Sequence, residues 1–290
     1  MQWERRFAPS VKSPDFEKGM VIIMKTFGFI GAGNMGYPML RGAMKAFGSD
    51  NVIYTDASTS RLDFVKKKTG LDYLADNKEV ISGAKFILLA VKPQYFDNVF
   101  KDIKEHLTKE HIVIYLAPGI TVADCKEALG SEVRIVRAMP NTPALVNEGM
   151  TAICFSDDVY TKEEKATLDI FFNAFGKYEV LEERLMNAIV CASGSSPAYV
   201  YMFIEALADS AVKYGIPRDK AYKFVAQTVM GSAKMVLETG EHPGVLKDMV
   251  CSPGGTTIAG VSALEEYGFR NAIIKASDAC YNKANRMKDK

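Results

Sequence analysis

The stretch KTFGFIGAGNMG, residues 25–36, limits the possible folds of this chain more than any other part of it. It begins with the β-type run TFGFI, continues through Gly31, Gly33 and Gly36, and leads into residues that can form a helix. In a strand, glycine turn and helix of this kind, the first glycine permits a tight turn and the second lets the backbone approach a pyrophosphate. The third lets helix and strand pack closely. Alone the motif is a weak signal, but in this context it predicts the first βαβ unit of a dinucleotide-binding fold.

The same alternation continues through the first half of the chain. Four further β-type runs follow at residues 51–56, 85–93, 111–119 and 133–140. Helix-like segments separate them at residues 59–70, 95–107 and 122–130. Apolar strands that alternate with amphipathic helices predict a mostly parallel sheet covered on both faces. MTAICFS and YEVL then read as added edge strands around a helix over residues 162–176.

From about Glu182 onward the strand signals stop and helices are expected. The longest apolar helix covers residues 194–217, with Ser196 as a candidate N-cap, Pro197 in the first turn and Gly215 with Pro217 at the end. Because its first half is apolar nearly all round, it must be buried on several sides. A small helical domain has too little interior for that, so a dimer interface is expected.

The stretch SPGGTT, residues 252–257, interrupts the helical half. Gly254, Gly255, Thr256 and Thr257 are expected at a helix N-terminus, where free N–H groups and the helix dipole attract an anion. An ordinary Ser/Thr-capped helix is the alternative. Two glycines with two threonines favour a ligand carboxylate instead.

Two signals disagree on the type of nicotinamide cofactor. Asp56 lies 20 residues after Gly36, where a carboxylate accepts hydrogen bonds from a free ribose 2′-hydroxyl and favours NAD. Residues that suit a 2′-phosphate, and so favour NADP, follow directly: Ser58, Thr59, Ser60 and Arg61. The choice stays open at the level of sequence.

Composition excludes several other classes of protein. A net charge of +1 provides no general attraction to nucleic acid or membrane, and no apolar run approaches the ~20 residues that span a bilayer. The five cysteines are scattered, which suits reduced thiols in a cytoplasmic protein. The three histidines do not cluster with cysteines or carboxylates, so no metal is expected.

These observations predict an α/β Rossmann dinucleotide-binding domain over residues 24–181, followed by an all-α dimerisation and substrate-binding domain over residues 182–290. Residues 1–23 show no clear period and lack the features of a signal peptide. We interpret them as a leader that is disordered or not native, with Met24 as the natural start.

Three blocks of sequence resemble the pyrroline-5-carboxylate reductase family: AMPNTPALVNEG (138–149), SGSSPAYVYMFIEALAD (193–209) and residues 240–270 around SPGGTT. GFIGAGNMG and AVKP (90–93) strengthen the resemblance, which covers the chain from Met24 onward. It implies reduction of the cyclic imine pyrroline-5-carboxylate to proline, the last step of proline biosynthesis, with NADPH or NADH. It also implies a helical domain that interlocks with a second subunit, an active site between the domains, and dimers that often assemble into decamers.

The resemblance also implies roles for individual residues. Cofactor contacts fall on Gly31, Gly33, Asn34, Met35, Gly36, Ser58, Asn77, Ala90, Val91, Lys92 and Pro93. Contacts with the substrate carboxylate are implied for Gly255, Thr256 and Thr257. The first hydroxyl residue of the family's substrate loop corresponds to Ser252. Thr257 matches the threonine that is proposed to hydrogen-bond the imine nitrogen.

Parts of the sequence are also compatible with two other functions. The glycine turn also resembles that of β-hydroxyacid dehydrogenases, which carry a catalytic lysine on the first long helix of the second domain. Here no lysine precedes Lys213 in that helix, about four turns along. The other alternative is a non-catalytic NAD(P)H-sensing module, against which SPGGTT argues, because a sensor needs no second ligand site.

Overall fold

A computed structural model describes residues 25–286, so the predictions for the leader and for Met24 lie outside the described residues. Its first half contains one seven-stranded sheet in the order β2-β1-β3-β4-β5-β6-β7. The strands are β1 (Lys25–Ile30), β2 (Val52–Thr55), β3 (Ala84–Leu89), β4 (Ile112–Tyr115), β5 (Arg134–Met139), β6 (Gly149–Phe155) and β7 (Gly176–Val180). The first five are parallel, whereas β6 pairs antiparallel with β5 and β7 runs parallel to β6.

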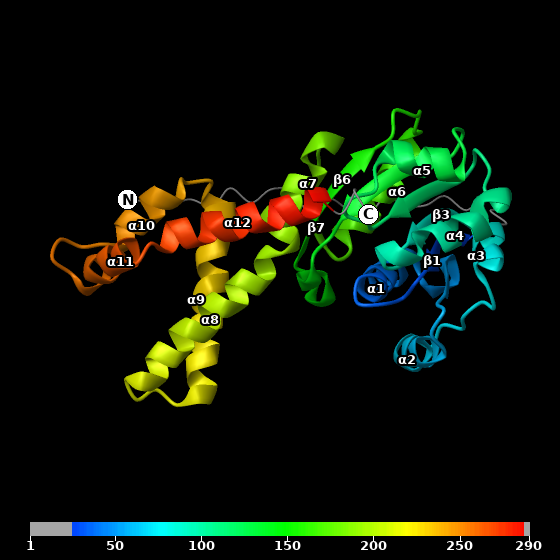
Figure 1. Cartoon of the computed structure of the whole chain (residues 1–290). Coiled ribbons are helices and arrows are strands. Elements are labelled where there is room, and N and C mark those ends of the chain that lie inside the picture. Colours follow the sequence, from blue (N-terminus) through cyan, green and yellow to red (C-terminus); the bar gives the residue numbers. More distant parts are fainter. Residues whose placement is uncertain (1–24, 287–290) are drawn as a thin grey trace.

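Helices cover both faces of this sheet (Figure 1). They are α1 (Gly36–Phe47), α2 (Thr59–Thr69), α3 (Asn77–Gly83), α4 (Phe96–Ile103), α5 (Val122–Leu129) and α6 (Lys162–Asn173). One core cluster packs residues of α1 and α6 against the sheet, and the Phe27 and Phe171 rings stack 4.3 Å apart within it. A second cluster packs residues of α3, α4 and α5 against the other face. The α/β fold predicted from the alternation is therefore confirmed.

Between β7 and residue 286, the regular elements that the structure describes are all helical. The α-helices are α7 (Met186–Ile189), α8 (Ser196–Lys213), α9 (Arg218–Thr239), α10 (Pro243–Val250), α11 (Thr256–Glu266) and α12 (Phe269–Arg286). Figure 1 shows α8 to α12 as an arm that extends away from the sheet, with α10 and α11 at its distant end. We call these five helices the arm. None of the helices between residues 25 and 286 has the length and apolar character needed to cross a membrane.

The N-cap predicted for α8 is wrong. The residues before α8 already form a π-helical turn, Val190–Gly194, and Ser195 is the N-cap. The Ser196 hydroxyl therefore donates backward to the Ala192 carbonyl at 2.7 Å instead of accepting from an N–H of α8. Pro197 lies in the first turn as expected.

The arm has almost no core of its own. Its cluster of buried apolar residues consists of Ala208, Ala221 and Val225. Large apolar side chains are exposed instead, for example Leu237 at 84% and Met249 at 73%. Exposed apolar surface of this extent indicates a surface that is covered by another protein chain.

Candidate functional site

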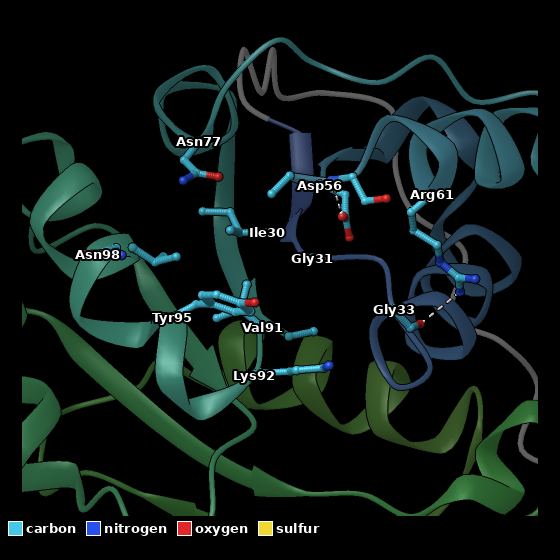
Figure 2. A pocket seen from close by; sticks show the side chains of 14 residues that line it. Ile30, Gly31, Gly33, Asp56, Arg61, Asn77, Val91, Lys92, Tyr95 and Asn98 are labelled. Atoms are coloured by element: carbon cyan, nitrogen blue, oxygen red, sulfur yellow. Dashed lines mark hydrogen bonds between the residues drawn. The ribbon is translucent and has the colours of Figure 1, made fainter.

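A cavity of about 630 Å³ lies at the carboxyl ends of β1, β2 and β3. This is the point where the order of parallel strands reverses, because β1 lies between β2 and β3. Open α/β sheets bind ligands at such points, and the volume lies in the range of small-molecule sites. Figure 2 shows the side chains that line the cavity, which belong to the glycine turn, to the ends of β2 and β3, and to the beginnings of α3 and α4.

A side chain is excluded from each of the three glycine positions for a different reason. Gly31 has a φ of +94°, and a Cβ there would lie 2.8 Å from the Ala90 carbonyl oxygen. A Cβ on Gly36 would collide with the Gly31 carbonyl oxygen. Gly33 lines the cavity, yet a Cβ there would meet no protein atom within 4 Å. The first and third glycines thus serve the fold, whereas the missing side chain of Gly33 leaves space for a ligand.

The start of α1 can receive an anion at the N–H groups before Tyr37, whose own N–H donates to the Gly33 carbonyl at 3.0 Å. Gly36 begins the helix, and the N-cap Met35 makes no side-chain cap hydrogen bond. The first N–H groups of a helix have no partner within the helix, and the positive end of its dipole lies there. A pyrophosphate beside Gly33 would meet these groups.

Asp56 and Arg61 hold the glycine turn from the β2 side. The Asp56 carboxylate accepts the Ala32 N–H at 2.7 Å through one oxygen and the Ser58 N–H at 2.9 Å through the other. Arg61 donates to the Gly33 carbonyl at 3.1 Å, as Figure 2 shows, and also to the Ala32 carbonyl. The Arg61 guanidinium lies 4.6 Å from the centroid of the Phe64 ring, which fixes its position further. Both charged side chains line the cavity.

The structure brings most of the predicted cofactor residues together. Gly31, Gly33, Asp56, Ser58, Asn77, Ala90, Val91 and Lys92 line the cavity. Asn34, Met35, Gly36 and Pro93 are their direct neighbours in the chain, in the glycine turn or after β3, but do not line it. In Figure 2 the Lys92 side chain runs across the lower part of the cavity toward the glycine turn.

Sequence reasoning missed five lining residues: Ile30, Ala57, Tyr95, Asn98 and Val99. Three of them follow AVKP, in the short helix Pro93–Tyr95 and the first turns of α4. Tyr95 is 53% exposed, which is high for a large aromatic side chain at the wall of a cavity. The signal that could have found them is their position just after a parallel strand, where the chain continues along the ligand-binding edge.

The SPGGTT loop has the geometry of an anion site. Gly255 is the N-cap of α11, and no side chain caps this helix. Gly254 has a φ of +68°, and a Cβ on Gly255 would collide with the Ser252 hydroxyl. The structure therefore does not support the alternative of an ordinary Ser/Thr-capped helix, and the N–H groups near Thr256 and Thr257 stay available.

The cavity and the SPGGTT loop lie far apart within one chain. Figure 1 shows α11 at the distant end of the arm, whereas β1 and β3 lie within the sheet domain on the other side. The resemblance predicts an active site between the domains, but the two domains of one described chain do not bring these parts together. Within residues 25–286, no group of three or more histidine, cysteine, aspartate or glutamate side chains is placed to hold a metal ion.

Comparison with known families finds one match in each half of the chain. Residues 183–287 match the family described as pyrroline-5-carboxylate reductase dimerisation. Residues 26–119 match the family described as NADP oxidoreductase, coenzyme F420-dependent.

Individual relatives match over nearly their whole length. Pyrroline-5-carboxylate reductase of Escherichia coli (strain K12) is 47% identical over 266 residues, which cover 91% of this chain and 98% of that protein. The enzyme of the same name from Methanosarcina acetivorans is 42% identical and covers 87% of this chain and 95% of its own length. A crystal structure of Plasmodium falciparum pyrroline carboxylate reductase with NADP bound has a TM-score of 0.82 at 34% identity, over 93% of this chain and 100% of that one. These similarities establish that the chain belongs to the pyrroline-5-carboxylate reductase family.

Proposed function

We propose that this chain catalyses the NAD(P)H-dependent reduction of 1-pyrroline-5-carboxylate to L-proline, the last step of proline biosynthesis. The proposal depends on one observation, the combination of two sites in a chain of this family. One is the cavity at the strand ends, which has the position of a dinucleotide site, and the other is the N-terminus of α11 on the arm, which follows two glycines and has no side-chain cap. The first suits a nicotinamide cofactor, and the second suits the carboxylate of a small substrate.

The residues fit a reaction that depends on positioning. A bound reduced nicotinamide would supply the hydride, which the imine carbon accepts while the nitrogen becomes an amine. A basic imine can bind already protonated, so no strong protein acid is required. The protein contributes by holding the two reactants in line. In this scheme the α11 N-terminus binds the carboxylate, and the Thr257 hydroxyl orients the imine nitrogen.

NADPH is the proposed cofactor, with NADH as a possible substitute. Both oxygens of the Asp56 carboxylate already accept hydrogen bonds from backbone N–H groups. This weakens the case that Asp56 binds a ribose 2′-hydroxyl. Arg61 and Ser58 line the same end of the cavity and can bind a 2′-phosphate. Gly33 leaves space for the phosphates, so the residues present fit a dinucleotide.

We further propose that each active site combines the cavity of one subunit with the SPGGTT loop of another. The length of the arm and its exposed apolar side chains support this arrangement, because a second copy would cover them. Assembly of the dimers into a decamer and a cytoplasmic location are additional proposals that rest on the family resemblance.

One assay tests the proposed function. The purified protein is incubated with pyrroline-5-carboxylate and either NADPH or NADH, cofactor oxidation is followed by absorbance, and proline is identified by chromatography. We expect turnover with both cofactors and a higher kcat/KM with NADPH. Oxidation of 3-hydroxyisobutyrate without imine reduction would favour the hydroxyacid dehydrogenase alternative. Cofactor binding without any turnover would favour the sensing module.

A further inference from the structure

The Asn77 side chain at the wall of the cavity is held by a residue outside the cavity. Asn77 is the first residue of α3, and its amide nitrogen donates to an Asp102 carboxylate oxygen at 2.9 Å. Asp102 lies on α4 and is not among the residues that line the cavity. Both side chains are half-buried, so water competes less for this hydrogen bond than it would on an open surface.

This contact fixes which end of the amide points into the cavity. An ionised carboxylate only accepts hydrogen bonds, so the amide nitrogen of Asn77 must face Asp102. The amide oxygen then faces the other way. Figure 2 shows this orientation, with the Asn77 oxygen directed toward Ile30 and the nitrogen directed away from the cavity.

Asp102 is not required for the start of α3 itself. The N-cap of this helix is Asp76, whose side chain accepts the Glu79 N–H at 2.9 Å. Glu79 in turn accepts the Ala75 N–H at 2.9 Å. These two contacts define the start of α3 independently of α4. The contact with Asp102 therefore determines the orientation of the Asn77 side-chain amide.

We propose that Asp102 is a positioning residue for cofactor binding: it orients the Asn77 amide so that its oxygen accepts a hydrogen bond from the adenosine half of the dinucleotide. This inference rests on the proposed function only in that a dinucleotide occupies the cavity. Asn77 lies on the same cavity as Asp56 and Ser58, which follow β2, and the residues after this strand meet the adenosine half in such folds. That half offers two kinds of donor, the adenine amino group and a ribose hydroxyl, whereas the phosphates offer acceptors.

A double-mutant cycle in the full-length protein tests the proposal. The variants are Asp102→Leu, Asn77→Ala and both together, and the dissociation constant for NADPH is measured by titration without substrate. Removal of one neutral hydrogen bond corresponds to roughly a 2- to 10-fold weaker affinity, so we expect each single variant in that range. The double variant should bind no more weakly than Asn77→Ala alone, because Asp102 acts through Asn77. KM for NADPH should rise with kcat nearly unchanged.

Asp97→Leu is the matched control, because Asp97 is an exposed carboxylate on the same helix that does not line the cavity. It should leave NADPH affinity unchanged. Additive effects of the two substitutions, or unchanged affinity in Asp102→Leu, would overturn the proposal. A merely structural role of Asp102 would lower Tm and kcat together, and this too would overturn it.

A cofactor analogue identifies the donor. Hypoxanthine in place of adenine removes the amino donor of NADPH. If the amino group is the donor, the analogue binds the wild type more weakly, and this penalty disappears in Asn77→Ala and Asp102→Leu. If a ribose hydroxyl is the donor, the penalty is the same in all three proteins, and the cycle above still supports the positioning role. Because binding is measured without substrate, a chain that binds NADPH but leaves pyrroline-5-carboxylate unchanged would refute the proposed function and not this inference.

Discussion

At the scale of single residues, the three glycines of the turn are needed for different reasons. Gly31 and Gly36 are required by neighbouring backbone atoms, and Gly33 by no protein atom. A stability measurement and a binding measurement should therefore separate them. In Gly33→Ala we expect an unchanged Tm and at least a several-fold higher KM for the cofactor, because the added methyl occupies ligand space.

Gly36→Ala is the matched comparison, and it should lower the free energy of unfolding by roughly 1–3 kcal/mol through overpacking. Tm by calorimetry and KM by steady-state kinetics check both variants. A large loss of stability in Gly33→Ala would contradict the separation of roles.

Arg61 is the residue that should decide between the two cofactors. We expect Arg61→Leu to raise KM for NADPH by roughly 10- to 100-fold, the value of one charge-assisted hydrogen bond to a phosphate. KM for NADH should rise less, through loosening of the glycine turn alone. The ratio of the two kcat/KM values is the measurement, and Arg41→Leu on α1 is a control that lies outside the cavity. An unchanged ratio would show that Arg61 serves only the turn.

Thr257 is the residue expected to act on the substrate. Thr257→Ala should lower kcat/KM for pyrroline-5-carboxylate by roughly one to three decades, because it removes one polar interaction with the reacting substrate. NADPH affinity should stay nearly unchanged, because the proposed contact of Thr257 is with the substrate imine and not with the cofactor. Thr257→Ser, which keeps the hydroxyl, should restore most of the activity. Wild-type kinetics in the alanine variant would refute the role.

At the scale of elements, one buried carboxylate fixes α6 on the sheet. Glu164 pairs with Lys85 of β3 at 2.7 Å and with Arg134 of β5 at 2.6 Å, and it also accepts the Thr161 N–H in a capping box. Burial by itself would raise the pKa of Glu164. Hydrogen bonds from Lys85, Thr161 and Arg134 outweigh burial and lower it below the usual value.

This lowered pKa predicts how stability depends on pH. A carboxylate whose pKa is lower in the folded state contributes stability above its unfolded pKa, and the contribution is lost as pH falls through the folded value. Glu164→Gln should therefore reduce the free energy of unfolding at neutral pH by roughly 2–3 kcal/mol, because two cations lose their partner. Below the pKa of Glu164 in the folded protein, the free energies of unfolding of the variant and the wild type should converge.

Urea unfolding at several pH values measures this effect. Glu179→Gln, an exposed carboxylate on β7, is the control with the same change of net charge, and it should change stability little. If the free energies of unfolding of Glu164→Gln and the wild type differed by the same amount at all pH values, the ionised Glu164 carboxylate would not be the source of the stability.

At the scale of the whole molecule, a polar chain joins the arm to the sheet domain. Arg137 of β5, 2% exposed, pairs with Glu183 at 3.2 Å and donates to Asn187 of α7 at 3.0 Å. Asn187 then donates to Asn285 of α12 at 3.1 Å. Directional contacts of this kind, together with apolar packing of α7, set the direction in which the arm leaves the sheet domain.

Subunit mixing tests whether the site is shared between chains. Thr257→Ala and Gly33→Asp each inactivate a different half of the site, the second through charge repulsion of the phosphates. In a mixed dimer the intact cavity of one chain meets the intact loop of the other, so one site of the two is restored. With random pairing we expect about a quarter of the wild-type activity after co-expression.

Each variant alone and a mixture of the two purified, unexchanged proteins are the controls. If both halves of the site came from the same chain, co-expression would restore nothing above these controls.

The sequence by itself determined the elements and their chemistry. Short apolar runs between helix-like segments identified the strands, because a strand buried on both faces of a parallel sheet is apolar along its length. The glycine spacing identified the cofactor turn, because strand, turn and helix follow one another directly and Gly36 packs against the Gly31 carbonyl five residues earlier. SPGGTT was recognised as a helix N-terminus for the same local reason.

Tertiary structure alone decided what distant segments do together. Sequence spacing could not show that the Asp56 carboxylate accepts the Ala32 N–H, since this contact depends on how the ends of β1 and β2 meet. It could not pair Asn77 with Asp102, which lie on different helices 25 residues apart. Nor could it show that SPGGTT is remote from the cavity of its own chain, because the direction of the arm follows from packing and buried polar contacts between residues far apart in sequence.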